Sequence, residues 1–213
     1  MSYKALYRTY RPKTFDDVVG QQHIVKTLKN AISKNKLAHA YLFCGPRGTG
    51  KTSIAKLLAK AINCEHADNA PCNECDSCIA ANENRHADIV EIDAASNNSV
   101  ENIRDLIEKV KYAPLMGKYK VYIIDEVHML SQGAFNALLK TLEEPPAHVI
   151  FILATTEPQK VLPTIISRCQ RYNFEKVSDN DIVKRLSYII EQENIKASED
   201  SLRLIADLSD GGM

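Results

Sequence analysis

The sequence has 213 residues, of which 45% are hydrophobic, and its 27 Lys and Arg residues balance its 27 Asp and Glu residues. This length predicts one large globular domain, or one domain with a smaller second one. The zero net charge excludes a strongly basic protein that binds nucleic acid over its whole surface, so any DNA contact must come from a local patch. We find neither a signal-peptide pattern nor a long apolar run, and we expect a soluble, cytoplasmic protein without a membrane partner.

The first segment, residues 3–17, mixes aromatic and basic residues without periodicity, and Pro12 and Gly20 punctuate it. We expect an irregular arm that lies against the domain, although a surface arm without a further role explains the segment equally well. Over residues 21–35 the apolar side chains recur on one face, which predicts a helix.

The most informative motif is G-P-R-G-T-G-K-T at residues 45–52, the pattern of a phosphate-binding loop. An apolar run over 40–44 predicts a buried strand before it, and helical spacing of apolar residues over 53–62 predicts a helix after it. Glycines let backbone N–H groups converge on an anion, and a helix N-terminus adds partial positive charge there. The alternative, a glycine-rich turn that happens to precede a helix, is disfavoured because every position of the motif matches in this context. The nucleotide-binding residues predicted here are Gly45, Pro46, Arg47, Gly48, Thr49, Gly50, Lys51 and Thr52, with Lys51 at the β- and γ-phosphates of ATP and the Thr52 hydroxyl on Mg²⁺.

Four cysteines form a second cluster: Cys64, Cys72, Cys75 and Cys78. The two Cys-x2-Cys spacings bring three thiolates to one tetrahedral zinc shell, and Cys64 can complete it. Residues 64–78 contain almost no large apolar side chain, so burial cannot offset roughly 1–2 kcal/mol of backbone entropy per ordered residue, whereas Zn²⁺ contributes roughly 10–16 kcal/mol in small modules. We therefore predict a structural Zn²⁺ rather than free thiols or disulfides. Cys44 is most simply a core residue.

Further along the chain, strands are predicted over 89–93 and 121–124 and a helix over 100–111, with Ser99 as its N-cap. The second strand ends in Asp125 and Glu126, the pattern of a second nucleotide-site motif. In that reading Asp125 supports Mg²⁺ and Glu126 polarises the attacking water. An acidic turn after a strand is the alternative, and the phosphate loop upstream favours the functional interpretation.

A helix over 131–142 and a strand over 149–154 follow, and Thr155 comes directly after that strand. Gly45, Asp125 and Thr155 therefore each lie at the end of an apolar strand. In an open parallel sheet ligands bind at the carboxyl ends of strands, so these residues are expected at one edge. Alternating strands and helices predict an α/β fold with a parallel sheet.

These motifs together resemble one family, the gamma/tau subunits of bacterial DNA polymerase III, which are AAA+ ATPases of the sliding-clamp loader. The matching segments are residues 7–12, the phosphate loop, the four cysteines and residues 125–130, 142–146 and 167–169. The resemblance implies an AAA+ P-loop NTPase with an inserted zinc module, acting as a hydrolase within the DNA-directed DNA polymerase (nucleotidyltransferase) holoenzyme. It also implies ATP, Mg²⁺ and Zn²⁺ as cofactors, and as partners further copies of the subunit, delta- and delta-prime-type subunits, the sliding clamp and primer-template DNA.

The resemblance also implies roles for individual residues. Arg11, Pro12 and Val19 would line the adenine pocket, and Thr155, or Thr156 if the register differs by one, would be the polar sensor beside the γ-phosphate. Arg168 would be an arginine finger that acts on ATP in the neighbouring subunit, so that function requires an oligomer. From the sequence alone Arg168 could equally be an ordinary surface or salt-bridged arginine. The catalytic set is then Lys51, Asp125, Glu126, Thr155 and Arg168.

From Ser178 onward two helices are predicted, over 179–193 and 199–208, without strands between them. We expect an ATPase domain over 1–178 and the start of a helical lid domain over 179–213. The chain stops where the family places a second sensor arginine, so we interpret it as an N-terminal fragment without the collar domain. Lys140 and, more weakly, Arg104 are candidate DNA contacts, although a solvated helix face explains both. Two other functions remain open: another AAA+ motor, such as a helicase loader or a branch-migration motor, or a nucleotide-binding scaffold.

Overall fold

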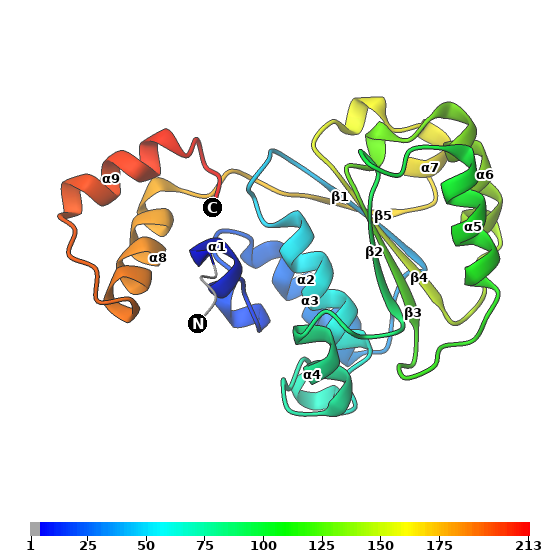
Figure 1. The fold of residues 1–213 in the computed structure, drawn as a ribbon, viewed down its shortest axis with the longest axis horizontal. Helices are drawn as coiled ribbons and strands as arrows, with labels where there is room; N and C mark the ends of the chain where they lie inside the picture. Colours follow the sequence, from blue (N-terminus) through cyan, green and yellow to red (C-terminus); the bar gives the residue numbers. More distant parts are fainter. Residues whose placement is uncertain (1–4) are drawn as a thin grey trace.

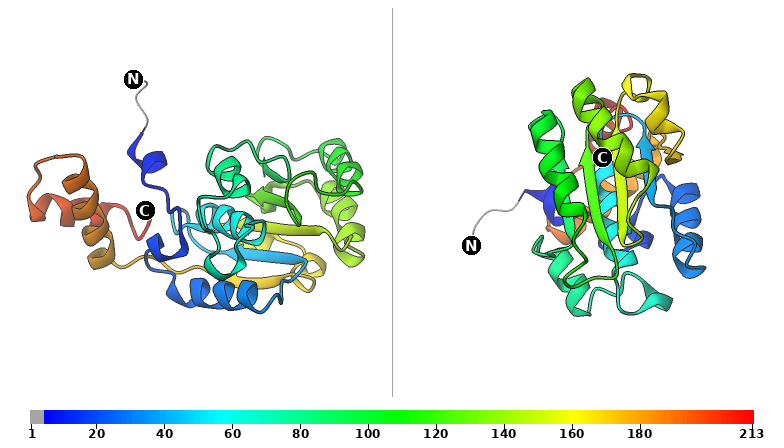
Figure 2. Two further views of the ribbon diagram at one scale, coloured as in Figure 1. Left: turned by 90° about the horizontal axis from the view of Figure 1, so that it is seen from below. Right: turned by 90° about the vertical axis from the view of Figure 1, so that its right-hand side faces the viewer.

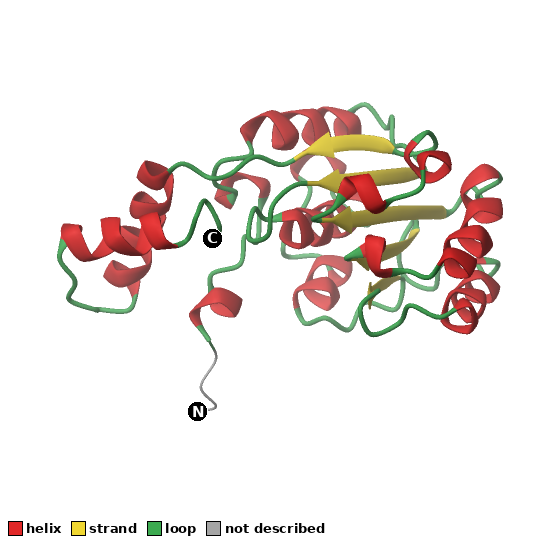
Figure 3. Cartoon of the chain, turned by 90° about the horizontal axis from the view of Figure 1, so that it is seen from above, coloured by secondary structure: helices red, strands yellow, loops and turns green. Residues whose placement is uncertain are grey.

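A five-stranded parallel sheet forms the centre of the computed structural model, which describes residues 5–213 (Figure 1). Its spatial order is β2-β3-β4-β1-β5, and every neighbouring pair is parallel. The strands are β1 (Ala40–Cys44), β2 (Ile89–Asp93), β3 (Lys120–Asp125), β4 (Val149–Thr155) and β5 (Gln170–Asn173). Because all five run in one direction, their carboxyl ends share one edge, which faces the two C-terminal helices (Figure 3). The predicted parallel α/β fold is confirmed.

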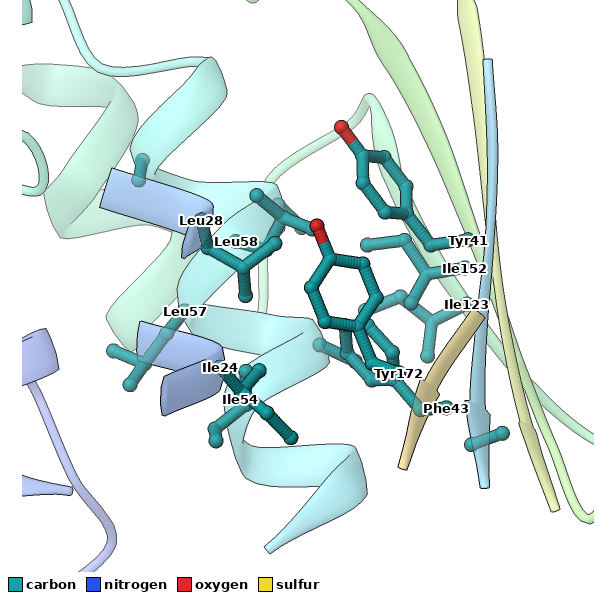
Figure 4. Packing of buried hydrophobic residues seen from close by; sticks show 14 of the residues in the cluster. Ile24, Leu28, Tyr41, Phe43, Ile54, Leu57, Leu58, Ile123, Ile152 and Tyr172 are labelled. Carbon is teal, nitrogen blue, oxygen red and sulfur yellow. The ribbon is translucent and has the colours of Figure 1, made fainter. Parts of the chain in front are cut away.

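Two helices cover one face of the sheet: α2 (Gln22–Ser33) and α3 (Lys51–Ile62). Strand residues two positions apart, such as Tyr41 and Phe43, point to this face. Figure 4 shows the resulting layer, in which aliphatic side chains from the helices meet aromatic and β-branched side chains from the strands. The labelled members of this cluster are Ile24, Leu28, Ile54, Leu57, Leu58, Tyr41, Phe43, Ile123, Ile152 and Tyr172.

The opposite face packs against α5 (Val100–Val110), α6 (Gln132–Glu143) and the short α7 (Pro163–Ile166). Here the alternate strand residues, Leu42 and Cys44 among them, face the helices. The sheet therefore lies between two helical layers, as the view along the long axis shows (Figure 2, right). Cys44 is a core residue, as predicted.

The remaining elements lie around this three-layer body. The arm contains α1 (Leu6–Thr9) and a helical turn, η1 (Phe15–Asp17), so the prediction of an irregular arm is only partly right; its first residue, Tyr3, lies outside the described residues. The cysteine segment contains η2 (Ala67–Asn69) and α4 (Asp76–Asn82). Two further turns are η3 (Val127–Met129) and η4 (Pro158–Lys160).

The C-terminal helices α8 (Asp179–Gln192) and α9 (Glu199–Leu208) pack on each other to one side of the sheet (Figure 1). Both begin with a serine cap, Ser178 and Ser198, whose side chain accepts a hydrogen bond from the backbone N–H three residues on. Among the residues that the structure describes, no helix combines the length and the apolar character needed to span a bilayer.

Candidate nucleotide-binding site

The phosphate-loop residues connect β1 to the first turn of α3. Gly45, Gly48 and Gly50 have φ values of 153°, 79° and 94°, a region that residues with a Cβ rarely adopt. A Cβ on Gly45 would lie 2.5 Å from the carbonyl oxygen of Phe174, so this position also needs glycine for the close approach of the segment that follows β5. The loop thus wraps the N-terminus of a twelve-residue helix, where backbone N–H groups favour an anion.

The ammonium group of Lys51 is buried beneath this loop. Its Nζ donates to the carbonyl oxygens of Gly45 at 2.8 Å and Pro46 at 2.6 Å. Burial lowers the pKa of Lys51, and the nearby carboxylates of Glu126 and Asp125 oppose that effect. A buried cation at this point is suited to an anionic ligand, because a phosphate would supply the charge that the protein leaves uncompensated.

Two oxygen ligands for a hard cation lie next to Lys51. The Thr52 hydroxyl donates to Asp125 Oδ2 at 2.6 Å, which joins the start of α3 to the end of β3. Hydroxyl and carboxylate oxygens are ligands that Mg²⁺ accepts, and Mg²⁺ in phosphate sites typically takes only one or two protein ligands. Thr52 and Asp125 therefore fit the magnesium site predicted from the sequence.

Glu126 follows Asp125 in a left-handed conformation, with φ of 47°, which is uncommon for a residue other than glycine. Its Oε2 accepts hydrogen bonds from the Thr156 hydroxyl at 3.0 Å and the Thr156 backbone N–H at 3.3 Å, and lies 3.4 Å from His128 Nδ1. The Glu126 carboxylate is thus held in place from two sides, by the turn at the end of β3 and by the loop after β4.

Thr155 and Thr156 have different surroundings. The Thr155 side chain is fully buried and pairs with His128 Nδ1 at 3.0 Å, whereas Thr156 contacts Glu126 directly. His128 also lies 3.3 Å from Glu157 through Nε2, so it connects Thr155 with Glu126 and Glu157. No sequence pattern predicted a role for His128; its position three residues after Asp125 was the available signal.

A cavity of about 720 Å³ opens over the loop. Its lining includes Arg11, Pro12 and Val19 from the arm side, the loop from Arg47 to Thr52, and the carboxylates of Asp125 and Glu126. The helices α8 and α9 contribute the outer wall, with Ile182, Arg185, Leu186, Ile189 and Ile205. Ligand pockets typically measure roughly 300–1,000 Å³, so a nucleotide is of suitable size. Sequence reasoning missed the residues of the outer wall, because no local motif marks them.

Arg168 lies outside this cavity. Its guanidinium donates to Glu143 Oε1, at the end of α6, and to the carbonyl oxygen of Thr164 in α7, both at 2.6 Å. Lys140 and Arg104, the candidate DNA contacts, are exposed on α6 and α5.

The four cysteines converge as expected. Their sulfur atoms all lie within 4.8 Å of one another, and Cys72 Sγ and Cys78 Sγ are 3.9 Å apart. Tetrahedral coordination with Zn–S bonds of about 2.3 Å places sulfur atoms about 3.8 Å apart, so the cluster has the size of a zinc site. The donor set also fits, because a backbone N–H of Glu74 and one of Cys75 donate to Cys72 Sγ and lower the pKa of that thiol to about 6, with the Glu74 bond contributing most. Burial raises the pKa of Cys78, a cost that a bound cation would reverse.

Comparison with known proteins agrees with the motifs. A family model described as "DNA polymerase III, delta subunit" matches residues 20–178. The chain is 62% identical to DNA polymerase III subunit tau of Bacillus subtilis, covering all of this chain and 38% of that protein, and 51% identical to subunit tau of Escherichia coli, covering 33% of it. It thus spans about a third of the length of these relatives. The resemblance to gamma/tau subunits is confirmed.

Solved structures share the fold. A DNA polymerase III gamma subunit-related protein of Thermotoga maritima has a TM-score of 0.58 at 24% identity, over 87% of this chain and 58% of that one. The RuvB Holliday junction branch migration motor of the same organism has a TM-score of 0.67 at 19% identity, over 95% of this chain and 61% of that one. At these identities the likeness concerns the fold alone, which is that of AAA+ P-loop proteins.

Proposed function

This chain belongs to the DNA polymerase III subunit family, with tau and gamma subunits among its relatives, and from that premise we propose that it binds and hydrolyses ATP as a clamp-loader subunit. In this proposal ATP hydrolysis between subunits drives loading of a sliding clamp onto primed DNA in the bacterial cytoplasm. The observation that carries it is the convergence of Lys51, Thr52, Asp125 and Glu126 on one cavity of nucleotide size.

The proposed chemistry divides among these residues. The loop N–H groups and the Lys51 ammonium bind the phosphates, and Thr52 with Asp125 would hold Mg²⁺, which neutralises charge on the β- and γ-phosphate oxygens when bound. Glu126 orients and polarises the attacking water. Its hydrogen bonds to Thr156 are available to hold the carboxylate in a defined orientation before ATP arrives.

The nucleotide base is assigned to the arm side of the cavity. Arg11, Pro12 and Val19 line it there, and the hydrophobic side chains of α8 provide the facing wall. As γ-phosphate sensor we retain Thr155. Thr156 is the second candidate for this role, and it is supported by the contact between its hydroxyl and the catalytic carboxylate.

Arg168 is proposed to act in trans. It is partly exposed and lies outside its own chain's cavity, so it is accessible to a neighbouring subunit once Glu143 releases it. A guanidinium beside the γ-phosphate is worth roughly 10³–10⁵ in rate in related enzymes. The partners in this proposal are further copies of the subunit, delta- and delta-prime-type subunits, the clamp and primer-template DNA, with Lys140 and Arg104 as candidate phosphate contacts.

Zinc at Cys64, Cys72, Cys75 and Cys78 is proposed as structural. Four thiolates complete a tetrahedral shell and leave no position open for a substrate or water.

The proposal is tested with Glu126→Gln, which keeps the shape of the side chain and removes its negative charge. We expect ATP turnover, measured with clamp, partner subunits and primed DNA, to fall by about 10²–10⁴-fold while ATP affinity by calorimetry stays close to wild type. Glu108→Gln, on the exposed face of α5, is the matched control and should change neither. Equal turnover for Glu126→Gln and wild type would remove the ATPase assignment.

Equal ATP turnover of Glu126→Gln and wild type would favour the alternative of a nucleotide-binding scaffold. A branch-migration motor rests on the likeness to RuvB, which extends to fold only. Stimulation of turnover by the clamp distinguishes a clamp loader from both.

A further inference from the structure

Lys60 is a buried lysine on the third turn of α3, distant from the phosphate loop in sequence, and it has no role in the chemistry above. Only 4% of it is exposed, yet its ammonium group makes three hydrogen bonds. It donates to the Lys13 carbonyl oxygen at 2.7 Å, to Asn73 Oδ1 at 2.6 Å and to Asn82 Oδ1 at 2.8 Å. All three donors of an ammonium group are therefore used, and within residues 5–213 no carboxylate contacts it.

Two of the three acceptors belong to the cysteine module. Asn73 lies between Cys72 and Cys75 in a left-handed conformation with φ of 63°, so its position depends on how that loop closes. Asn82 is the last residue of α4, the helix that carries Cys78, and its amide nitrogen donates to Asn73 Oδ1 at 3.2 Å. The cysteine loop and α4 thus present two oriented carbonyl dipoles to one buried cation.

The third acceptor belongs to the arm. Lys13 follows Arg11 and Pro12, and its own N–H donates to Asp17 Oδ2 at 3.0 Å, which makes the turn before Val18 and Val19 compact. At its other end the arm is held by the Arg185 guanidinium of α8, which donates to the Tyr10 carbonyl oxygen at 2.8 Å. The arm that lines the cavity is therefore held by α8 at Tyr10, by the core at Phe15 and Val18, and, through Lys60, by the cysteine module.

We propose that Lys60 is a positioning residue that couples the metal-binding module to the adenine side of the nucleotide pocket. Closing the cysteine loop around a metal ion fixes Asn73 and Asn82, these orient the Lys60 ammonium, and Lys60 holds the Lys13 carbonyl so that Arg11 and Pro12 face the cavity. This inference rests on the proposed function, since it assigns the base to the arm. It gives the module a part in nucleotide recognition beyond local stability.

The test separates binding of the base from binding of the phosphates. In the full chain Lys60→Met keeps the length and apolar stem of the side chain and removes its three donors. We expect its affinity for Mg·ATP to fall about tenfold, the equivalent of 1.4 kcal/mol, while the affinity for inorganic triphosphate stays within about twofold of wild type. Lys56→Met is the matched control, because Lys56 lies one turn earlier on α3 and pairs with Glu91 rather than with the arm.

One further variant and one treatment test the path and guard against misfolding of Lys60→Met. Asn73→Gly retains the left-handed backbone and all four cysteines but removes the acceptor, and it should show the same selective loss of ATP affinity. Chelation of the metal should lower the ATP affinity of the wild type by the same factor. In Lys60→Met it should lower the ATP affinity by less than about a further twofold, because chelation and the substitution break the same connection. Equal weakening of ATP and triphosphate, or unchanged ATP affinity in both variants, would overturn the proposal.

Failure of the proposed function is distinguishable from failure of this inference. If wild type does not bind ATP, the nucleotide assignment fails, but the coupling can still be read from amide hydrogen exchange. Residues 10–19 should then exchange about tenfold faster in Lys60→Met and Asn73→Gly than in wild type or Lys56→Met. Unchanged exchange in this segment would reject the coupling itself.

Discussion

At the scale of single residues, Asp88 illustrates how one buried carboxylate can hold a loop. It is fully buried just before β2 and accepts hydrogen bonds from the backbone N–H groups of Leu115, Met116 and Gly117 at 2.7–2.8 Å. Burial alone would raise the pKa of Asp88, but these hydrogen bonds, with that of Gly117 strongest, outweigh it and the net pKa is lowered. The side chains of Leu115 and Met116 in this loop are exposed. The loop backbone is therefore ordered by its hydrogen bonds to Asp88 rather than by burial of its own side chains.

We predict that Asp88→Asn lowers the free energy of unfolding at pH 7 by about 2 kcal/mol, because charge-assisted hydrogen bonds are replaced by neutral ones. The sign of the pH dependence follows from the lowered pKa. The contribution is complete above the unfolded pKa of about 3.9 and is lost as the pH falls through the folded value. Urea unfolding of both proteins should therefore show a difference that is constant from about pH 7 to 5 and shrinks below about pH 4. Asp105→Asn, on the exposed face of α5, is the control, and a difference that grows on acidification would contradict the prediction.

The role of Asp88 could not be predicted from the sequence, because its partners lie 27–29 residues away and contribute only backbone groups. Lys51, Asp125 and Glu126 could be predicted, because each belongs to a local pattern whose chemistry is carried by the residue type. The same contrast separates Lys51 from Lys60, two buried lysines of one helix, of which only the first lies in a motif.

At the scale of elements, the apolar cluster of the cysteine module contains little other than its cysteines. Its buried cluster consists of Cys64, Cys75 and Cys78, with Ala70 and Cys72 against it. Such a segment cannot compensate the entropy of ordering through burial. The predicted metal would then act as the module's core.

We predict that purified wild-type chain carries one zinc ion and that Cys72→Ser carries none. Loss of the metal should lower the melting temperature, by roughly 2–4 °C for each 1 kcal/mol of lost stability at this chain length. Zinc content by elemental analysis and thermal unfolding by circular dichroism measure both effects. Cys169→Ser removes a cysteine outside the module and should retain the zinc. Full metal content in Cys72→Ser would contradict the ligand assignment.

Elements with clear periodicity could be predicted closely from the sequence. β2 begins and ends at the predicted residues, and the longer helices differ from their predicted ranges by one or two residues at most ends. β5 was missed because it is an edge strand in which Gln170, Arg171 and Asn173 are exposed and only Tyr172 faces the core. α4 was missed because the pattern in that segment was set by cysteines rather than by a hydrophobic face.

At the scale of the whole molecule, the site is assembled by topology. β1 lies between β4 and β5, and β3 lies beside β4, so the phosphate loop and Asp125 come from strands far apart in sequence that end at one edge. This convergence could be predicted from the order of strands and motifs. The outer wall could not be predicted, because it is placed by long-range contacts. One of them joins the segment after α9 to the phosphate loop, from the Met213 N–H to the Gly48 carbonyl oxygen at 2.8 Å.

The location of Arg168 outside its own cavity leads to a prediction about subunit mixing. Arg168→Ala should lower ATP turnover by about 10³–10⁵-fold, and Lys51→Ala should abolish ATP binding, when each replaces every copy in the assembly. In an equimolar mixture of the Arg168→Ala and Lys51→Ala variants, an interface is active when a subunit with intact Lys51 lies next to a neighbour with intact Arg168. Random assembly makes about a quarter of head-to-tail interfaces of this kind, so we expect about a quarter of the wild-type turnover.

The control mixture replaces Lys51→Ala with the double variant Lys51→Ala, Arg168→Ala, which offers no intact arginine to the neighbour and should restore nothing. Arg203→Ala, which removes an exposed arginine of α9 paired with Glu199, should retain full turnover alone. Because Arg168 does not line the cavity that contains Lys51, recovery in the first mixture and its absence in the second can arise only across a subunit boundary. Activity of Arg168→Ala close to wild type would instead leave the arginine with its observed structural role, the ion pair to Glu143 that joins the end of α6 to α7.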